Sequence, residues 1–214
     1  MGIAEEMRDM NSDGYMEAYI SANYEKKEEQ QIQRVENIEK AGKEYLIGDL
    51  HMFDENIIKF EKRQFENAEK AAWEMIRSWN SVVKEEDTVY VLGDLFYEGC
   101  TEEQIATIMA RLNGKVVLIV GNHDWSLLDV LSKYMEIIRY PIVKDDFWIL
   151  SHEPMYVNEA APYANIFAHV HNNPMYKTVS SRSFCVSAER INYTPILWEY
   201  VKDAVLQCDE LKNK

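Results

Sequence analysis

The chain has 214 residues, 47% of them hydrophobic, and this length and composition predict a soluble globular protein with one substantial core. The formal net charge of −14 argues against nonspecific binding to long nucleic acid, because that binding depends on Lys and Arg side chains that neutralise phosphates. No segment has the length and apolarity of a transmembrane helix, so we expect no membrane partner.

Residues 1–40 differ in composition from the rest of the chain, since Met, Glu, Lys and Gln predominate and proline is absent. Apolar residues recur at three-residue intervals at Ile32, Val35 and Ile38, which suits a helix with a narrow packing stripe and equally a solvated helix with frayed ends. We expect an acidic N-terminal helical extension over residues 1–40 and a globular domain over residues 41–214.

Three buried strands are expected in the globular domain, and each runs directly into a motif of polar residues. The apolar runs at residues 45–47, 89–92 and 116–120 precede the motifs GDLH, GDL and GNHD. The carboxyl ends of strands in an open α/β sheet are the expected location of an active site.

Helices and shorter strands alternate along the rest of the domain. Residues 65–83 carry apolar side chains at helical spacing, and a capping box at Thr101 and Gln104 begins a second helix that we expect to end near Asn113 and Gly114. Later strands are expected over residues 136–140, 147–150, 165–168 and 184–186, with a hairpin turn at residues 145–146. This alternation predicts an α/β fold but does not by itself distinguish a sandwich from a doubly wound sheet.

All five histidines lie in short motifs that are rich in metal-ligand residues. In chain order the motifs GDLH, GDL, GNHD, SHEP and AHVH contribute Asp49, His51, Asp94, Asn122, His123, Asp124, His152, His169 and His171. Carboxylate and imidazole ligands suit borderline divalent metals, and two ions about 3.5–4 Å apart can bind both oxygens of an in-line displacement at phosphorus. On a locally extended chain, the alternate spacing within GDLH and AHVH would point both side chains of each pair to one side. One such motif is a weak signal, but their joint occurrence predicts a dinuclear metal site.

These motifs and their order resemble the calcineurin-like metallophosphoesterase superfamily. The resemblance covers about residues 44–206 and is closest to small single-domain bacterial and phage phosphoesterases. In those proteins the first motif is followed by an Asn-Ile-Ile segment and an Arg, matched here by residues 56–58 and Arg63. The resemblance implies a four-layer α/β/β/α sandwich, in which two mixed sheets are flanked by helices.

The resemblance also implies a role for each polar residue of the motifs. One metal ion would be held by Asp49, His51 and His171, the other by Asn122, His152 and His169, and Asp94 would bridge the two. His123 would be the catalytic histidine, Asp124 would orient it, and a hydroxide bridging the metals would be the nucleophile. The two divalent ions are expected to be Mn²⁺, although Fe, Ni, Zn and Co accept the same ligands.

Three further residues are candidate substrate contacts, namely Asp54, Asn56 and Arg63. Asp54 stands where the similar phosphoesterases have a third histidine, which adds negative charge and is expected to alter substrate choice or metal affinity. Arg63 could hold a phosphate oxygen or, equally, a structural carboxylate. Ser151 and Ala168 replace family glycines, and we expect both changes to be harmless.

We expect an enzyme that hydrolyses a small phosphorylated substrate, a diester rather than a monoester, because no Arg cluster for a dianionic monoester is evident. Three alternatives stay open: a phosphomonoesterase or nucleotide pyrophosphatase with the same site, a metal-stabilised binding scaffold without turnover, and a di-iron redox protein. Aromatic residues of the surrounding segments could stack on a nucleobase or pack onto their own scaffold, and these are Phe53, Phe96, Tyr97, Tyr156 and Tyr163. The sequence does not indicate an oligomeric state.

The cytoplasm is the expected location of the protein. Residues 1–10 lack the basic-then-apolar pattern of a signal peptide. The cysteines, Cys100, Cys185 and Cys208, are odd in number and show no zinc-ligand or redox spacing. We therefore interpret them as reduced thiols of a reducing compartment.

Overall fold

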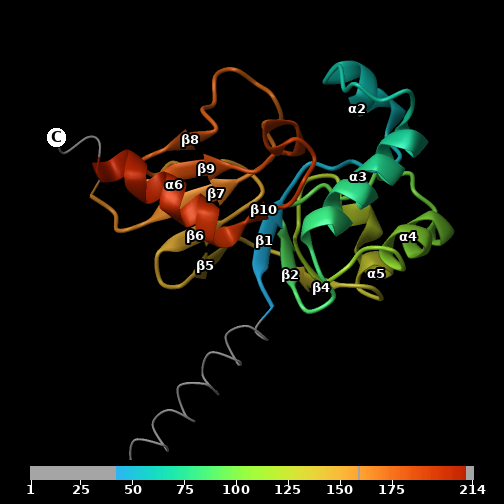
Figure 1. Cartoon of the computed structure of the whole chain (residues 1–214), viewed down its shortest axis with the longest axis horizontal. Coiled ribbons are helices and arrows are strands. Elements are labelled where there is room, and N and C mark those ends of the chain that lie inside the picture. The colour runs from blue at the N-terminus through green and yellow to red at the C-terminus, as the bar shows by residue number, and fades with distance from the viewer. Residues whose placement is uncertain (1–41, 159, 211–214) are drawn as a thin grey trace, which may run out of the picture. The chain divides into compact units, whose positions relative to one another are not determined.

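Two five-stranded mixed sheets form the centre of the protein (Figure 1). The structure is a computed structural model that describes residues 42–158 and 160–210, with only the backbone of residues 209 and 210. The helical extension expected over residues 1–40 lies outside the described residues. The predicted α/β architecture of two mixed sheets with flanking helices is confirmed.

The first sheet has the strand order β10-β1-β2-β3-β4. Its strands are β1 (Glu44–Ile47), β2 (Thr88–Val91), β3 (Lys115–Ile119), β4 (Glu136–Ile138) and β10 (Ile196–Leu197). Strands β1 to β4 are parallel, with Leu46 opposite Tyr90 and Tyr90 opposite Val117, whereas β10 pairs antiparallel with β1. The parallel strands therefore end at one edge, where the GDLH, GDL and GNHD segments follow β1, β2 and β3.

The second sheet has the strand order β5-β6-β7-β9-β8. Its strands are β5 (Ile142–Lys144), β6 (Trp148–Leu150), β7 (Ala164–Phe167), β8 (Val179–Ser180) and β9 (Ser183–Cys185). Strands β6, β7 and β9 are parallel, and β5 and β8 pair antiparallel at the two edges. Residues 145–147 join β5 to β6, with φ values of 52° and 54° at Asp145 and Asp146 and the N–H of Phe147 donated to the carbonyl of Lys144, so the predicted hairpin turn is confirmed.

Helices cover the first sheet on the side away from the second sheet (Figure 1). They are α3 (Ala68–Val82), α4 (Glu102–Met109) and α5 (Leu128–Leu131), while α2 (Glu55–Phe60) precedes α3 and α6 (Trp198–Glu210) follows β10. Short 3-10 turns occupy Trp125–Leu127 and Ala188–Ile191. Helix α3 begins at Asn67, whose side chain accepts the N–H of Lys70 at 2.8 Å, and its buried residues lie on one face.

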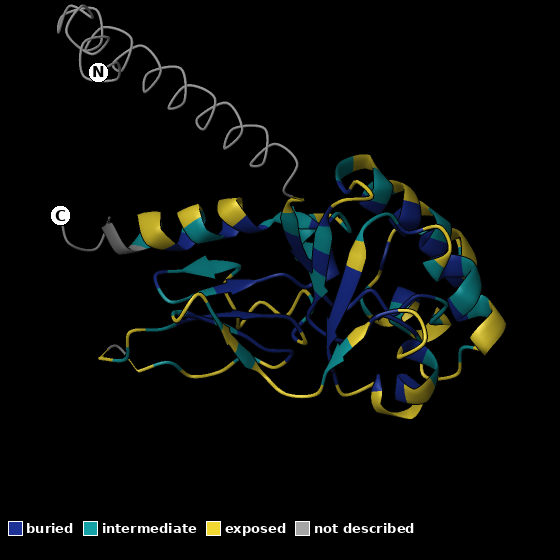
Figure 2. Ribbon diagram, turned by 90° about the horizontal axis from the view of Figure 1, so that it is seen from below, coloured by how far each residue is buried: buried dark blue, intermediate teal, exposed yellow. Residues whose placement is uncertain are grey.

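Strand β1 divides the interior into two cores, because its side chains alternate between the faces of the sheet. Tyr45 and Ile47 pack with side chains of α3, α4 and α5, whereas Leu46 packs with residues of the second sheet and α6. Trp148 and Trp198 meet edge to face in this second core, with ring centroids 5.4 Å apart. Buried residues accordingly concentrate in the strands, and exposed residues lie along the outer faces of the helices (Figure 2).

Helix α4 ends earlier than the sequence predicts. The predicted capping box is present, since Thr101 Oγ1 accepts the N–H of Gln104 and the Gln104 side chain accepts the N–H of Thr101. The helix stops at Met109 rather than near Asn113. Asn113 is instead bound to the end of α3, because its N–H donates to Asn80 Oδ1 at 2.9 Å and its side-chain amide donates to the carbonyl of Val83 at 3.0 Å.

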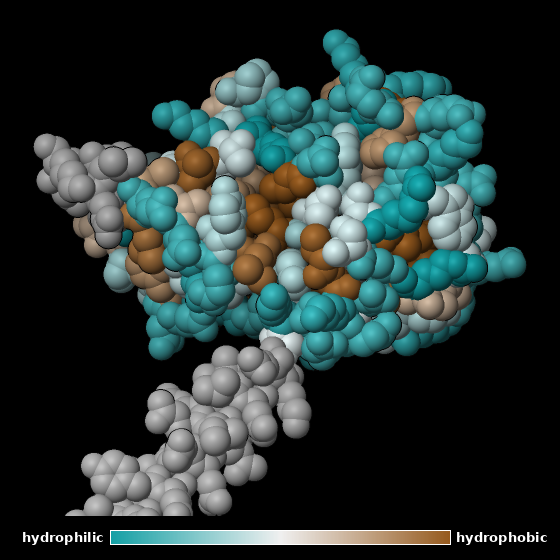
Figure 3. Space-filling model, in the orientation of Figure 1, coloured by the Kyte–Doolittle hydropathy of each residue, from teal (hydrophilic) through white to brown (hydrophobic). Residues whose placement is uncertain are grey.

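An apolar groove of about 650 Å³ lies beside β1, β10 and α6, and is lined by residues that include Tyr45, Ile196 and Leu197. Apolar side chains gather on this face of the molecule (Figure 3). Within residues 42–158 and 160–210, no helix combines the length and the apolar character needed to cross a membrane.

Candidate metal centre

The ligand motifs lie where strands of both sheets end, and their backbone is left-handed. Asp49, His51, Asp94, His169 and His171 all have φ between 46° and 69°. Residues other than glycine seldom adopt this conformation, because it destabilises the fold by about 1–3 kcal/mol per residue. It therefore persists only where the surrounding structure holds the backbone in place. The prediction that GDLH and AHVH are locally extended is therefore wrong, because the backbone turns at each ligand.

The first ligand group consists of Asp49, His51 and His171, each of which offers one atom within 4.8 Å of the other two. Asp49 and His51 are buried, and within the described part of the chain Asp49 Oδ2 and His51 Nε2 have no hydrogen-bond partner. Buried polar atoms without a partner are destabilising. A divalent ion between these atoms would bind both, so the residues present fit the implied metal.

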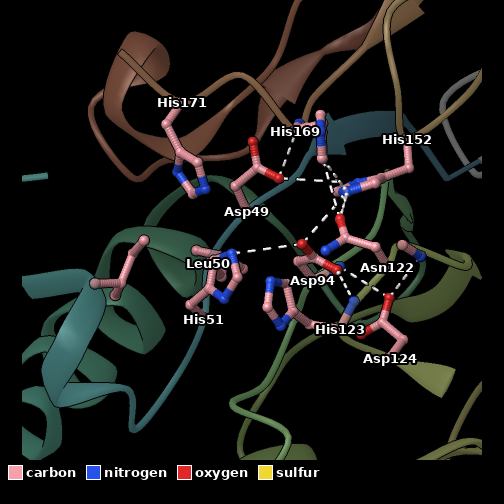
Figure 4. Close-up of polar contacts among 12 residues, drawn as sticks. Asp49, Leu50, His51, Asp94, Asn122, His123, Asp124, His152, His169 and His171 are labelled. Carbon is pink, nitrogen blue, oxygen red and sulfur yellow. Dashed lines mark hydrogen bonds and ion pairs between the residues drawn. The ribbon is translucent and has the colours of Figure 1, made fainter. Parts of the chain in front are cut away.

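The second ligand group consists of Asn122, His152 and His169 (Figure 4). Asn122 Oδ1 lies 2.9 Å from His152 Nε2 and 3.0 Å from His169 Nδ1, and these two nitrogens are 3.0 Å apart. His152 Nδ1 lies 2.8 Å from the carbonyl oxygen of Leu92, and donating a proton there leaves Nε2 free to act as a ligand. His169 and His171 thus belong to different groups, although they are only two residues apart.

Asp94 lies between the two groups. Its Oδ2 atom is 3.5 Å from His51 Nε2 and 3.3 Å from His152 Nε2. The turn that carries it has no room for a further side chain, since a Cβ on Gly93, whose φ is 83°, would lie 2.2 Å from His152 Nδ1. One carboxylate is therefore held where it can bind metal on both sides.

Burial and charge set the protonation of these ligands in the metal-free protein. Burial lowers the pKa of His51 to about 3, so its imidazole is neutral at pH 7. Burial alone would raise the pKa of Asp94, but the hydrogen bond and charge of His152 outweigh it and lower that pKa to about 2. Burial also opposes the charge on His152, but the carboxylates of Asp94 and Asp49 outweigh it and raise the pKa of His152 to about 9. Metal binding at neutral pH must therefore displace the His152 proton.

Asp124 holds the turn before Asp94 rather than the ring of His123, which corrects the role that the resemblance implies. Asp124 Oδ2 accepts the N–H groups of Asp94 and Gly121, both at 2.8 Å, and its Oδ1 accepts the N–H of Leu95 at 3.3 Å. Burial, together with the charge of Asp94, raises the pKa of Asp124 to about 6. The physical reason is that the chain turns after His123, so the two side chains point away from each other (Figure 4).

His123 faces the metal ligands from the GNHD turn. Its side chain is 46% exposed, and its ring centroid lies 5.2 Å from that of His51. Its backbone N–H donates to Asp94 Oδ1 at 2.9 Å, and the carboxylate of Glu98 lies 3.7 Å from its Nδ1. His123 is thus held at the backbone while its imidazole can reach a bound molecule.

Arg63 is a structural residue, which corrects its inclusion among the substrate contacts. Its side chain is 0% exposed, and its Nε and Nη2 donate to Glu189 Oε1 at 2.9 and 2.6 Å. Its Nη1 and Nη2 also donate to the carbonyl oxygens of Leu50 and Asp49, both at 2.7 Å. Of the two roles that the sequence left open, these contacts support the one with a structural carboxylate.

The departures from the family pattern have identifiable places in the structure. Asp54 is the N-cap of α2 and accepts the N–H of Asn56 at 2.7 Å and that of Ile57 at 3.4 Å. Ser151 and Ala168 are both buried, and Ser151 Oγ donates to the carbonyl of Glu153 at 2.7 Å. Asp54 therefore has a structural task in addition to lying beside the site.

The ligands open into a cavity of about 590 Å³. It is lined by Asn56, Ile57, Lys59 and Phe60 of α2, by His123, and by the candidate metal ligands His51, Asp94, Asn122, His169 and His171. Sequence reasoning missed Lys59 and Phe60, because a six-residue helix shows little periodicity, although the Asp54-Glu55 pair is a helix-start signal. It also missed Glu98 and Glu189, which lie in no recognisable motif.

Comparisons with known proteins identify a family and several similar proteins. A profile of the calcineurin-like phosphoesterases matches residues 45–210. An uncharacterised protein of Methanocaldococcus jannaschii is 33% identical over 161 residues, with 71% of this chain and 85% of that protein covered. Among solved structures, a protein of unknown function from Aquifex aeolicus superposes with a TM-score of 0.59 at 26% identity, covering 76% of this chain and 98% of that one. A nuclease of Pseudomonas putida gives a TM-score of 0.44 at 23% identity, with 60% and 61% of the two chains covered.

The family profile spans most of the chain, including every residue of both ligand groups and the turn that carries His123. The chain belongs to the calcineurin-like phosphoesterase family and is a metal-dependent phosphoester hydrolase.

Proposed function

We propose that this hydrolase uses two divalent metal ions to cleave a small phosphodiester. The observation that carries the proposal is the placement of Asp94, whose carboxylate lies within 3.5 Å of imidazole nitrogens from both ligand groups. A single carboxylate between two sets of ligands is the arrangement that a pair of ions requires. The adjoining cavity of about 590 Å³ has the size of a small-molecule site.

One ion would be held by Asp49, His51 and His171, the other by Asn122, His152 and His169, with Asp94 shared. Divalent ions held by these residues would supply hydroxide at neutral pH and polarise the phosphoryl oxygens. We propose Mn²⁺ as the native ion, and Fe, Ni, Zn and Co suit the same mixture of carboxylate, amide and imidazole ligands.

His123 is the proposed acid that protonates the leaving oxygen. Its imidazole borders the cavity, and the backbone hydrogen bond to Asp94 fixes it relative to the ligands. Proton transfer from a positioned histidine typically accelerates a reaction by about 10²- to 10⁴-fold. The half-exposed ring can exchange its proton with water between turnovers.

The charge of the cavity favours a diester over a monoester. Apart from the histidines, Lys59 is the single basic residue among the described residues that line the cavity. Arg63 does not line it, because its guanidinium is hydrogen-bonded to the backbone carbonyls of Asp49 and Leu50. A dianionic monoester is usually bound by several Arg or Lys side chains, whereas a monoanionic diester needs fewer. The net charge of −14 further favours a small substrate over long nucleic acid.

The test is hydrolysis of bis(p-nitrophenyl) phosphate beside p-nitrophenyl phosphate by protein stripped of metal and reloaded with Mn²⁺. We expect Mn²⁺-dependent cleavage with preference for the diester, and loss of activity in Asp94→Asn. Glu102→Gln is the matched control, because Glu102 is exposed, pairs with Lys133 and does not line the cavity. Preference for the monoester would overturn the diester assignment, and binding of two ions without cleavage of either compound would overturn the proposed substrate class.

We also propose a cytoplasmic location. Cys100, Cys185 and Cys208 are all free thiols, which is typical of proteins from reducing compartments. Fractionation of cells that produce the protein tests this, and recovery outside the cytoplasm would contradict it.

A further inference from the structure

Glu189 is a buried carboxylate beside the first ligand group, but it belongs to neither ligand group and does not line the cavity. It lies in the 3-10 turn Ala188–Ile191, and its side chain is 5% exposed. A buried carboxylate is stable only where it is paired and hydrogen-bonded. The partners of Glu189 therefore indicate what it does.

The first partner is the imidazole of His171. His171 Nδ1 lies 3.1 Å from Glu189 Oε1 and 3.3 Å from its Oε2. A carboxylate can only accept, so Nδ1 carries the proton and donates it to Glu189. That choice of tautomer leaves Nε2 with a lone pair, which is the form in which a histidine binds a metal ion.

The second partner is Arg63, which connects Glu189 to the first motif. The guanidinium donates twice to Glu189 Oε1 and once to each of the carbonyl oxygens of Asp49 and Leu50. The planar fork of Arg holds such partners in a fixed geometry. The buried Arg63–Glu189 ion pair therefore holds both the GDLH turn, which follows a strand of the first sheet, and the ring of His171, which follows a strand of the second sheet.

We propose that Glu189, held by Arg63, is the positioning residue of the first metal site, where it fixes the tautomer and orientation of His171. The inference rests on the proposed dinuclear function. The proposed role of Glu189 applies to the first metal site alone. In the second group, the Nδ1 proton of His152 is accepted by the carbonyl of Leu92 rather than by a carboxylate.

The test is Mn²⁺ binding to the full chain, followed by titration and by electron paramagnetic resonance. Wild-type protein is expected to bind two ions that show exchange coupling. Glu189→Ala is expected to weaken the first site by about 10- to 100-fold, leave the second site unchanged and abolish the coupling. Glu189→Gln keeps an oxygen acceptor for His171 and Arg63, so its first-site affinity should lie closer to that of wild type.

The matched control is Asp87→Asn. Asp87 is also a buried carboxylate, and it accepts the backbone N–H groups of Lys43 at 2.7 Å and Lys84 at 2.8 Å, away from the metal ligands. We expect Asp87→Asn to lower the melting temperature without a change at either metal site. A loss of stability alone therefore does not imitate the predicted effect.

Equal first-site affinity in folded Glu189→Ala and wild-type protein would overturn the proposal, and so would an equal loss at both sites. If Glu189→Ala does not fold, Glu189→Asp replaces it, because it keeps the charge beside Arg63 and withdraws the carboxylate from His171. This variant must show the same selective loss, and unchanged binding in it would overturn the proposal. Wild-type protein that binds two ions but cleaves no diester would contradict the proposed function and leave the role of Glu189 intact.

Discussion

Asp124 Oδ2 accepts the backbone N–H of Asp94 at 2.8 Å, and the same oxygen accepts the N–H of Gly121 at the same distance. The turn after β2 and the turn after β3 are thereby joined by a single buried carboxylate. The shared ligand Asp94 and the proposed acid His123 are carried by these two turns, so Asp124 fixes their separation.

The first prediction concerns Asp124→Asn. An amide keeps one acceptor oxygen but adds N–H donors that face backbone N–H groups, so we expect a loss of about 1–3 kcal/mol in the free energy of unfolding. Urea denaturation of the metal-free protein measures this. Asp129→Asn, at an exposed position of α5, is the control and should change stability by less than about 0.5 kcal/mol. Equal stability of the two variants would show that Asp124 does not hold the turns.

The second prediction concerns His123 and the leaving group. If His123 protonates the leaving oxygen, His123→Ala should lower kcat by about 10²- to 10⁴-fold for a diester with an alkoxide leaving group. The loss should be much smaller for a p-nitrophenolate leaving group, which departs without a proton. Steady-state kinetics on the two substrates measures the difference, with the Mn²⁺ content of each variant as control. Equal losses for both leaving groups would contradict the role of acid.

The third prediction concerns proton release on metal binding. The pKa of His152 in the metal-free protein is raised to about 9, because the carboxylates of Asp94 and Asp49 outweigh the effect of burial. His152 is therefore protonated at pH 7 and must lose that proton to bind an ion, so apparent affinity should rise with pH until about pH 9. Asp94 and His51, with pKa values lowered to about 2 and about 3, release none.

Calorimetric titration of Mn²⁺ at pH 7 in two buffers with different ionisation enthalpies measures that release. We expect the observed heats to differ by about the difference between the buffers for each proton transferred. His152→Asn is the control, because it removes this imidazole while keeping a neutral oxygen ligand, and there the release should fall by about one proton. Heats that do not depend on the buffer at pH 7 would refute the assignment.

The fourth prediction concerns Phe60, whose side chain is 79% exposed at the rim of the cavity. Phe60→Ala should raise KM for a diester with an aromatic group by at least about fivefold, since stacking on an aromatic side chain contributes about 1–3 kcal/mol. KM for an aliphatic diester should change little. Tyr140→Ala is the control, because Tyr140 is 73% exposed and does not line the cavity. An equal effect of the two substitutions would exclude stacking at Phe60.

The strands and the candidate metal ligands could be identified from sequence for a physical reason. Buried parallel strands are continuous apolar runs, and the runs that became β1, β2 and β3 end directly at Asp49, Asp94 and Asn122. Histidines are few in this chain and all lie in motifs, so their chemistry was visible without a structure. The proposed roles of these residues stay predictions until metal binding is measured.

The supporting residues could not be predicted, because their partners are distant in sequence or are backbone atoms. Glu189 lies 126 residues from Arg63 and 18 from His171, in a turn without any motif. Asp124 follows His123 directly, and adjacency suggested a contact that the turn of the backbone prevents. Helix α6 and strand β10 were missed because β10 has two residues and its apolar signal merges with that of the helix.

The left-handed backbone at five ligand positions limits which residues evolution can place there. Asp, Asn and His are the residues other than glycine that enter this conformation most readily, because a short polar side chain can compensate locally. The residues at these five positions are Asp and His, which are also candidate metal ligands. Replacement of a ligand by Asn therefore changes the coordination alone, whereas replacement by Val or Ile would strain the main chain as well. Loss of metal binding in this fold should thus proceed through Asn or Gly and leave the turns unchanged.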